Sequence, residues 1–438
     1  MGENKTDAWT QTTEYTIPQV TSPEGGWTKG TIAEKILGNM KRTESVDACY
    51  FRAYALIFNE WFRNENITEP AEVPKGDATT TGSNGTDYVV DLVKGGMPAK
   101  AVKYADYFTR ALPEPQKGPD VYLPLGQTAP IVGVDYTQNA TGINTTNNNT
   151  ANIVVGNGQA TQANILWPAT TATGGPIGLA ADLSLADGAT INQLRQAFAV
   201  QRMYEVDARG GTRYTEILRA HFGVVSPDSR LQRPEYLGGK RTPINITQVV
   251  QQSATNDVSP QGTTAAYSLT IDVHEDFTKS FTEHGIILGL CVIRTEHTYQ
   301  QGLERKFSRK DRTDFYFPEL SNIGEQAIKN KEIFVQGNEE DDEVFGYQEA
   351  WAEYRYGINK VTGELNSDYD TPLDSWTYAD DYDSLPTLSD EWIRETDQNV
   401  ARTLAIQNQD QWIANFYFDQ TWIRPMPIYS IPQLTGWN

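Results

Sequence analysis

The stretch Asp207–Ser253 places the tightest limits on what this chain can fold into. It opens on Gly210-Gly211, and a glycine pair ends an incoming helix because glycine freely adopts backbone conformations that helices exclude. Apolar residues then recur at helical spacing over Tyr214–Phe222, which predicts one short amphipathic helix. Gly223 and Pro227 end this helix. The stretch is therefore too broken to form one long helix, and its second half must be a loop that leads into a strand.

The residues from Arg230 to Gly239 have neither the helical nor the strand period. Such a segment keeps one shape only if side chains hold it in place. The planar guanidinium of arginine bonds carbonyls and carboxylates bidentately and stays charged at any working pH, so Arg230 and Arg233 are predicted to pin the segment. Two glycines let the backbone turn or approach another chain closely. We call this segment the arginine loop, with the candidate residues Arg230, Arg233, Glu235, Tyr236, Gly238 and Gly239.

The sequence offers little for catalysis or metal binding. It contains neither a GxSxG motif nor a phosphate-binding loop, and its four histidines form no HExxH motif. The acidic runs Glu339–Glu343 and Asp380–Asp383 could hold calcium, but they lack the EF-hand pattern, so solvated acidic loops are the favoured interpretation. We predict no catalytic residue, no cofactor and no metal ligand.

Charge limits the partners of the chain. Among 438 residues there are 36 Lys and Arg against 57 Asp and Glu, a formal net charge of −21. This charge repels phosphate, so the surface as a whole cannot bind nucleic acid.

One segment, Tyr299–Tyr316, does interleave basic and aromatic residues, as sites for single-stranded nucleic acid do. We call it the basic stretch. Its candidate DNA contacts are Arg305, Lys306, Phe307, Arg309, Lys310 and Arg312. Salt bridges with acidic residues of neighbouring copies are the alternative interpretation and the favoured one.

Two further segments have helical periodicity. Apolar residues recur at i, i+3, i+4 and i+7 from Val46 to Phe62, which predicts a helix over 45–63 with Ser45 as its N-cap. Thr190 and Gln193 form a capping box for a helix over 190–208, so helices are predicted within 190–222.

Apolar and β-branched runs predict several strands, at Ser268–His274, Gly285–Thr295, Glu349–Tyr356 and Trp412–Ile423. Gly285–Thr295 is the most apolar run and is predicted to be a central buried strand. Cys49 and Cys291 lie in apolar segments and are predicted to be buried free thiols. Sheets with helices in their connections indicate a mainly β fold, a decorated β-sandwich.

The composition changes between residues 126 and 188. This segment is rich in Thr, Asn, Ala and Gly and carries almost no charge. It is too long for an ordinary connection within a compact domain, so it needs a function of its own. Scattered Ile and Val pairs allow short strands.

The stretch Asp207–Ser253 resembles the signature stretch of the major capsid proteins of gokushovirus-like Microviridae, small tailless icosahedral phages with circular single-stranded DNA. Similar blocks follow in family order at Phe51–Asn66, Tyr104–Gly118, Phe281–Gly285, Thr298–Glu304, Gly324–Ile333, Val344–Tyr356 and Arg424–Pro432. Together the blocks span most of the chain and are highly specific.

The resemblance implies a viral jelly-roll β-sandwich, eight-stranded in the family, with long helical and loop insertions. It implies a non-enzymatic subunit that self-assembles into a T=1 icosahedral shell around circular single-stranded DNA. Residues 1–125 would form the N-terminal part of the jelly roll and 189–438 the remainder. Residues 126–188 would be the variable protrusion at the threefold axis, which presents the host-attachment surface. Family chains carry further sequence upstream, so the first strands of the jelly roll are expected to be missing here.

The implied partners follow from the same resemblance. They are other copies of this chain, packaged single-stranded DNA, a small basic DNA-packaging protein, other virion proteins and a bacterial surface receptor. The arginine loop would lie at a subunit contact or against the inner wall. Family relatives sometimes bind structural metal ions, so this point stays open.

The expected location is the virion, after assembly in the bacterial host cytoplasm. No apolar run reaches the length of a membrane span, and the polar start of the chain is unlike a signal peptide. A different class of protein, a secreted or surface β-sandwich that binds carbohydrate, fits the acidic and Trp- and Tyr-rich composition. The missing signal peptide counts against it.

Overall fold

The structure is a computed structural model of the chain. It describes residues 17–38, 41, 44–119, 121, 131–133, 143–144, 150–151, 179–181, 191–227, 233–250, 264–401, 410 and 412–424. The α-helices are α1 (Ile32–Leu37), α2 (Cys49–Ile57), α3 (Ile191–Gly210), α4 (Tyr214–Phe222), α5 (Asn330–Ile333), α6 (Asp390–Ile393) and α7 (Gln398–Ala401). The strands are β1 (Gln19–Thr21), β2 (Ser45–Asp47), β3 (Thr80–Thr81), β4 (Ile131–Gly133), β5 (Ile143–Asn144), β6 (Thr150–Ala151), β7 (Leu179–Ala181), β8 (Ile246–Val250), β9 (Thr264–Ser268), β10 (Glu325–Lys329) and β11 (Val344–Glu349).

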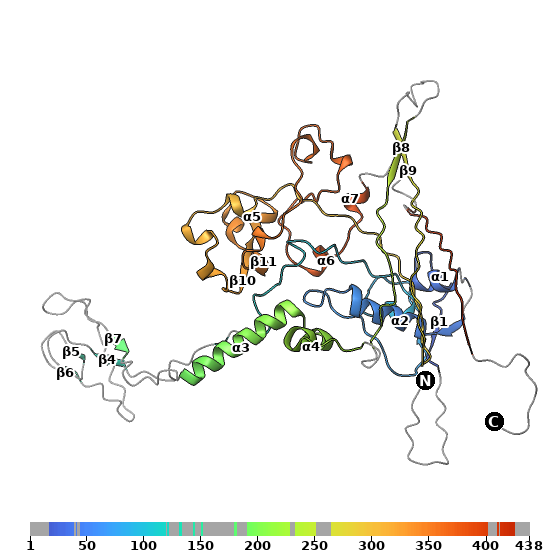
Figure 1. Ribbon diagram of the computed structural model, residues 1–438, viewed down its shortest axis with the longest axis horizontal. Helices are drawn as coiled ribbons and strands as arrows, with labels where there is room; N and C mark the ends of the chain where they lie inside the picture. The colour runs from blue at the N-terminus through green and yellow to red at the C-terminus, as the bar shows by residue number, and fades with distance from the viewer. Residues whose placement is uncertain are drawn as a thin grey trace, which may run out of the picture.

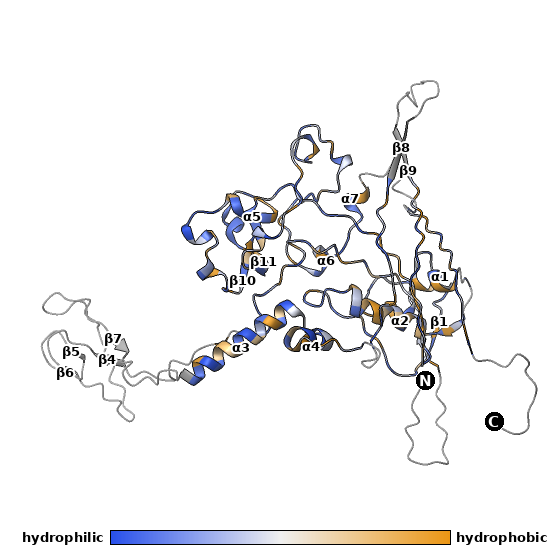
Figure 2. Ribbon diagram, viewed as in Figure 1, coloured by the Kyte–Doolittle hydropathy of each residue, from blue (hydrophilic) through white to orange (hydrophobic). Residues whose placement is uncertain are grey.

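A first core forms around α2, which is orange along much of its length in Figure 2. Phe51, Ala55 and Phe58 recur at i, i+4 and i+7 and are buried on one face. Trp27 packs on Phe51 with ring centroids 6.0 Å apart. A three-stranded sheet in the order β2-β1-β3 lies beside the helix, with β1 antiparallel to β2 and parallel to β3. The N-terminal part of the chain therefore builds its own small core (Figure 1).

The predicted helix over 45–63 begins later than its periodicity suggests. Ser45 is not an N-cap: it lies in β2, where its hydroxyl hydrogen-bonds Thr21 at 2.8 Å. The Asp47 carboxylate accepts the Cys49 backbone N–H at 2.8 Å, and α2 starts there. A π-helical turn over Phe58–Phe62 follows α2. The apolar spacing begins in β2 and continues into α2. The spacing alone therefore does not show at which residue the helix begins.

A second core forms around the antiparallel pair β10 and β11, where Ala327 faces Tyr347. Phe108 is fully buried and packs edge-on against Tyr299, with ring centroids 4.7 Å apart, and against Phe345, at 6.1 Å. This core gathers segments distant in sequence, among them the start of the basic stretch at the buried Tyr299.

The two predicted helices of the 190–222 region are confirmed. α3 ends at Gly210, and Gly211 has a φ of +88°, which only glycine adopts readily. α4 packs on α3, and the His221 ring hydrogen-bonds the Asp207 carboxylate at 2.7 Å. Figure 1 shows both helices in green beside each other, and Figure 2 shows the mixed polar and apolar surface of α3. The predicted capping residue Thr190 lies outside the described residues.

β8 and β9 form a hairpin in which Ile246 faces Ser268. Two contacts beyond the hairpin fit the same antiparallel register, since Glu235 pairs with Lys279 and Gly238 lies against Asp276. In all three pairs the two residue numbers add up to the same total. The pairs therefore belong to one antiparallel register without a shift. We call the two segments 233–245 and 269–281 the ribbon. In this register Leu269, Ile271 and Val273 share one face, and each is more than 70% exposed.

Several predicted strands are wrong within the described residues. Gly285–Thr295 joins no strand ladder, and Cys291, predicted to be buried, is exposed. Ser268–His274 keeps only Ser268 in a strand, and Trp412–Ile423 joins none, with Ile413 98% exposed. Glu349–Tyr356 is mainly a turn after β11. Side-chain period indicates which face is apolar, but a strand also needs a hydrogen-bonding partner, which local sequence does not specify.

The described residues thus contain one three-stranded sheet and four two-stranded pairs, with modest helix content. Within 126–188 the described pairs are β4 with β7 and β5 with β6, both antiparallel. The jelly roll stays a prediction. Among the described residues, no helix is both long enough and apolar enough to cross a membrane.

Candidate functional site

Arg233 of the arginine loop is held against the end of α2. Its Nε lies 2.8 Å from Glu60 Oε2, and its guanidinium sits over the Trp61 ring, 5.1 Å from the centroid. It also donates to the Thr215 hydroxyl on α4. The Arg233 side chain is 14% exposed, so a planar cation joins the π-helical turn after α2, α4 and the loop at one half-buried point.

Further contacts hold the residues of the loop that follow Arg233. The Trp61 indole N–H donates to the Pro234 carbonyl at 3.0 Å, and the Tyr236 ring lies 6.1 Å from Trp61. Glu235 forms an ion pair with Lys279 across the ribbon. Tyr236 itself is 64% exposed. The loop is therefore fixed on its inner side and open on its outer side.

Gly238 is required where the two segments of the ribbon meet. A Cβ at this position would lie 2.4 Å from the Asp276 carbonyl oxygen, closer than any real contact. A Cβ on Gly239 would lie 2.9 Å from the Tyr236 hydroxyl. The close approach that the sequence predicted for this glycine pair thus occurs within the chain. Arg230 lies outside the described residues.

The basic stretch divides into a buried and an exposed set. Arg305 donates to Glu332 from both Nε, at 3.1 Å, and Nη2, at 2.8 Å. Arg309 pairs with Glu353 at 3.4 Å and has a 14% exposed side chain. These two arginines hold the second core together from within the chain.

The remaining candidates of the basic stretch face outward: Lys306, Phe307, Lys310 and Arg312. Lys306 pairs with Glu304 and lies over the Phe307 ring, and Arg312 lies over Phe317. Phe307 is 66% exposed. A row of exposed cations and aromatic rings is available here for a partner.

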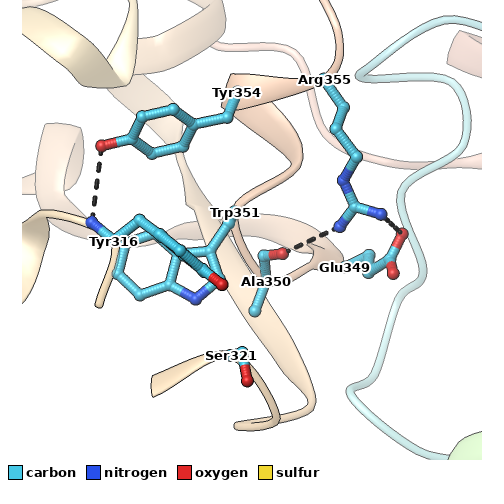
Figure 3. A pocket seen from close by; sticks show the side chains of 7 residues that line it. All are labelled: Tyr316, Ser321, Glu349, Ala350, Trp351, Tyr354 and Arg355. Atoms are coloured by element: carbon cyan, nitrogen blue, oxygen red, sulfur yellow. Dashed lines mark hydrogen bonds and ion pairs between the residues drawn. The ribbon is translucent and has the colours of Figure 1, made fainter. Parts of the chain in front are cut away.

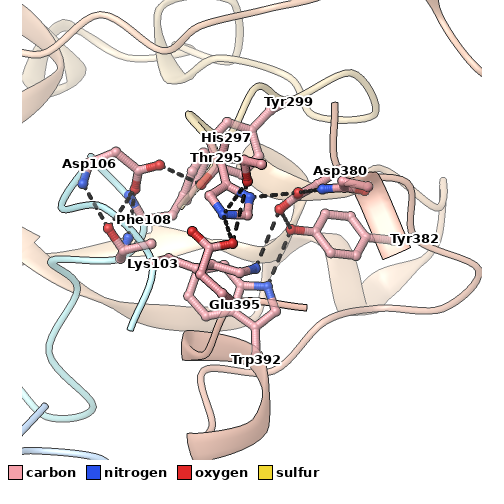
Figure 4. Close-up of polar contacts among 12 residues, drawn as sticks. Lys103, Asp106, Phe108, Thr295, His297, Tyr299, Asp380, Tyr382, Trp392 and Glu395 are labelled. Atoms are coloured by element: carbon pink, nitrogen blue, oxygen red, sulfur yellow. Dashed lines mark hydrogen bonds and ion pairs between the residues drawn. The ribbon is translucent and has the colours of Figure 1, made fainter. Parts of the chain in front are cut away.

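A buried ionic cluster joins four segments of the second core (Figure 4). His297 hydrogen-bonds Asp380 through Nδ1 at 2.8 Å and Glu395 through Nε2 at 3.2 Å. Lys103 lies 3.5 Å from Asp380, and the Tyr382 hydroxyl donates to Asp380 at 2.7 Å. Asp380 is buried, so its assignment to a solvated acidic loop is wrong. The cluster could not be predicted from the sequence because the partners of His297 lie 83 and 98 residues away along the chain.

The cluster is built to hold charge rather than to react. Burial lowers the pKa of His297, but hydrogen bonds to the two carboxylates outweigh it and raise this pKa to about 9. Burial alone would raise the pKa of Asp380, yet His297 and Lys103 bring it down to about 2. Both ring nitrogens are occupied by carboxylates, so His297 is a protonated cation with no lone pair for a metal or a substrate. The described residues contain no group of three or more side chains suited to a metal ion.

A family model described as capsid protein (F protein) matches residues 1–434. This chain belongs to that family. It is 41% identical to the capsid protein VP1 of Spiroplasma virus 4, over 99% of this chain and 81% of the relative. It is also 41% identical to the capsid protein VP1 of Bdellovibrio phage phiMH2K, over 97% of this chain and 80% of the relative. The capsid protein VP1 of Chlamydia phage 1 is 38% identical, over 99% and 83%.

The resemblance to gokushovirus-like microviruses is confirmed by these relatives, and the function of the chain is that of a structural capsid protein. Such a protein assembles with itself into the shell of a virion. The carbohydrate-binding alternative, which rested on composition alone, is replaced by this finding.

Proposed function

We propose that this capsid protein forms a T=1 icosahedral shell of jelly-roll subunits around circular single-stranded DNA. The observation that carries the proposal is the family match across nearly the whole chain. The ribbon supports it further. An antiparallel pair with one uncovered apolar face is what one sheet of a β-sandwich presents to the other, and Leu269, Ile271 and Val273 form such a face.

The proposed DNA contact is the exposed part of the basic stretch, with Lys306, Lys310 and Arg312 on phosphates. A net charge of −21 disfavours genome binding elsewhere on the surface. A small basic packaging protein is the partner that would neutralise the remaining phosphates. Residues 126–188 are the proposed host-attachment surface, and their near-absence of charged side chains suits an outer loop.

The subunit acts by packing and has no catalytic site in this proposal. Assembly takes place in the cytoplasm of the bacterial host before release of the virion. The arginine loop lies near a subunit contact, where the exposed Tyr236 meets the next copy.

Sedimentation combined with nuclease digestion tests the proposal. Particles purified from phage-producing cells are treated with nuclease, and the DNA that survives is probed for strandedness and circularity. We expect the chain to sediment with circular single-stranded DNA that resists digestion. Particles that contain the chain but protect no DNA would contradict the genome-enclosing role.

A further inference from the structure

An open pocket of about 420 Å³ lies beside the basic stretch, at the outer edge of the second core. Figure 3 shows the aromatic side chains that line it, with Arg355 and Glu349 at its rim. Its volume falls within the range of small-molecule sites and is large enough for a single nucleobase with its sugar.

Trp351 forms the wall of the pocket and is held in place from behind. It is the one non-glycine residue with positive φ, at 65°, among the described residues, a conformation that L-amino acids rarely adopt. Its indole N–H donates to the Leu320 carbonyl at 2.8 Å, and it is only 5% exposed. The hydrogen bond and the burial of the ring hold the wall of the pocket in place.

Two tyrosines form the accessible faces. The Tyr316 ring lies edge-on to Trp351 with centroids 5.7 Å apart, and the Tyr354 ring lies 6.3 Å from Trp351. Tyr316 is 48% exposed and Tyr354 is 53% exposed. The buried Arg309 guanidinium supports Tyr354 at 4.7 Å from the ring centroid. The rings of Tyr316 and Tyr354 are therefore held in place and accessible to solvent.

The rim of the pocket is charged. Arg355 pairs with Glu349 at 3.1 Å and donates to the Ala350 carbonyl at 3.2 Å, while half of its side chain stays exposed. Glu349 on its own would repel a phosphate, but Arg355 neutralises it. The exposed cations Lys310 and Arg312 of the basic stretch precede Tyr316 in the chain. Aromatic faces beside cations are the combination that binds single-stranded nucleic acid, with bases on the rings and phosphates on the charges.

We propose that this pocket takes one base of a single-stranded nucleic acid, which stacks on Tyr316 and Tyr354 while Arg355 contacts an adjacent phosphate. The inference rests on the proposed function, in which the shell encloses single-stranded DNA, and it assigns a place on the subunit to a base contact. A sugar could also stack on tyrosine, but the neighbouring cations favour a polyanion.

The test compares two fluorescently labelled probes by anisotropy: a fifteen-nucleotide oligothymidine and an abasic strand with the same number of phosphates. We expect the capsid protein to bind oligothymidine at least about tenfold more tightly than the abasic strand, since stacking on an aromatic ring is typically worth this much per base. Tyr354→Ala should abolish most of this difference between the two probes. Tyr354→Phe keeps the ring and should restore it.

Tyr369→Ala is the matched control, because Tyr369 is equally exposed, at 49%, and lies outside the pocket. Circular dichroism of each variant checks folding. Equal binding of the two probes by the unaltered protein would overturn the proposal, and it needs no variant to fold. Loss of oligothymidine binding in Tyr369→Ala, or a Tyr354-dependent preference for a neutral oligosaccharide over DNA, would also overturn it.

The test of the pocket and the test of the proposed shell can fail independently of each other. If particles form and protect DNA while Tyr354→Ala leaves probe binding unchanged, the pocket proposal fails and the proposed function stands. If the chain forms no particles, the two-probe comparison on the same protein still decides the pocket.

Discussion

Single residues decide how the second core holds together, and His297 is the clearest example. Its two carboxylate partners and Lys103 bring two positive and two negative charges into one buried space (Figure 4). Removal of one charge from such a cluster leaves its partners uncompensated, which costs more than the loss of an exposed ion pair.

The protonation of His297 makes the stability of the capsid protein depend on pH. Its pKa is about 9 in the folded chain against 6.5 as the ordinary value, so its contribution is complete below about pH 6.5 and is lost as pH rises through 9. The full difference amounts to about 3 kcal/mol. Urea unfolding between pH 6 and pH 9.5 should show this loss, and His297→Gln should flatten the curve. A wild-type midpoint that does not move over this range would refute the assignment.

Arg233 is the residue of the arginine loop whose loss should matter most. Arg233→Ala removes the ion pair to Glu60 and the contact with Trp61, while Arg213 Nε still lies 4.0 Å from Glu60. We expect a loss of roughly 1–3 kcal/mol in the free energy of unfolding and a block of particle assembly under conditions in which the subunit stays folded.

Sedimentation and circular dichroism of the Arg233 variant measure the two effects. Arg219→Ala on the exposed side of α4 is the matched control and should assemble normally. Normal particles from Arg233→Ala would show that the loop is not needed for assembly.

Among the elements, the ribbon is defined by its register. If the register of β8 and β9 continues to Glu235 and Lys279, then Leu237 and Phe277 face each other. A double variant with Leu237→Cys and Phe277→Cys, made without the exposed Cys291, should form a disulfide on mild oxidation. Leu237→Cys with Val273→Cys is out of register and should not. Gel mobility with and without reductant reads the result, and equal cross-linking of both pairs would contradict the register.

Residues 126–188, the proposed surface insertion, allow a test of whether this segment serves attachment and not the fold. Its replacement by a short Gly-Ser linker should leave soluble subunits and abolish attachment to host cells, because a segment with so little charge and no periodicity contributes little to a core. Solubility after expression and adsorption of particles to cells are the two readouts. An insoluble deletion variant would show that the segment belongs to the fold.

Prediction from the sequence succeeded where structure is local. The helix at Tyr214–Phe222 and the turn at Gly211 depend on spacing and on one glycine, and both are confirmed. The predicted start of α2 was wrong because Val46, which fits the helical spacing, lies in strand β2. The strand predicted at Gly285–Thr295 was wrong because a strand needs a pairing partner elsewhere in the chain. The predicted exposure of Asp380 was wrong because its partner His297 is distant in sequence.

The candidate sites follow the same division. The sequence pointed to Arg233 and to the basic stretch, but not to the fact that Arg305 and Arg309 are bound to Glu332 and Glu353 inside the chain. Nor could it reveal the pocket, since Tyr316 and Trp351 meet across 35 positions of sequence through the turn after β11.

At the scale of the whole molecule, the subunit leaves apolar side chains uncovered on the ribbon and along 412–424. Exposed apolar surface of this extent indicates an interaction surface in a soluble protein. A closed shell covers such surfaces by repeating the same contacts around symmetry axes. The acidic net charge opposes close packing of copies, so a basic partner or salt should favour assembly.

Cryo-electron microscopy of the purified particles can decide whether this capsid protein builds an icosahedral shell from jelly-roll subunits. We expect uniform particles with T=1 symmetry, in which the ribbon forms part of a jelly-roll sandwich and residues 126–188 project at the threefold axes. Particles of another symmetry would contradict the proposed T=1 shell. Subunits in which the ribbon stands apart from any sandwich would contradict the proposed jelly roll.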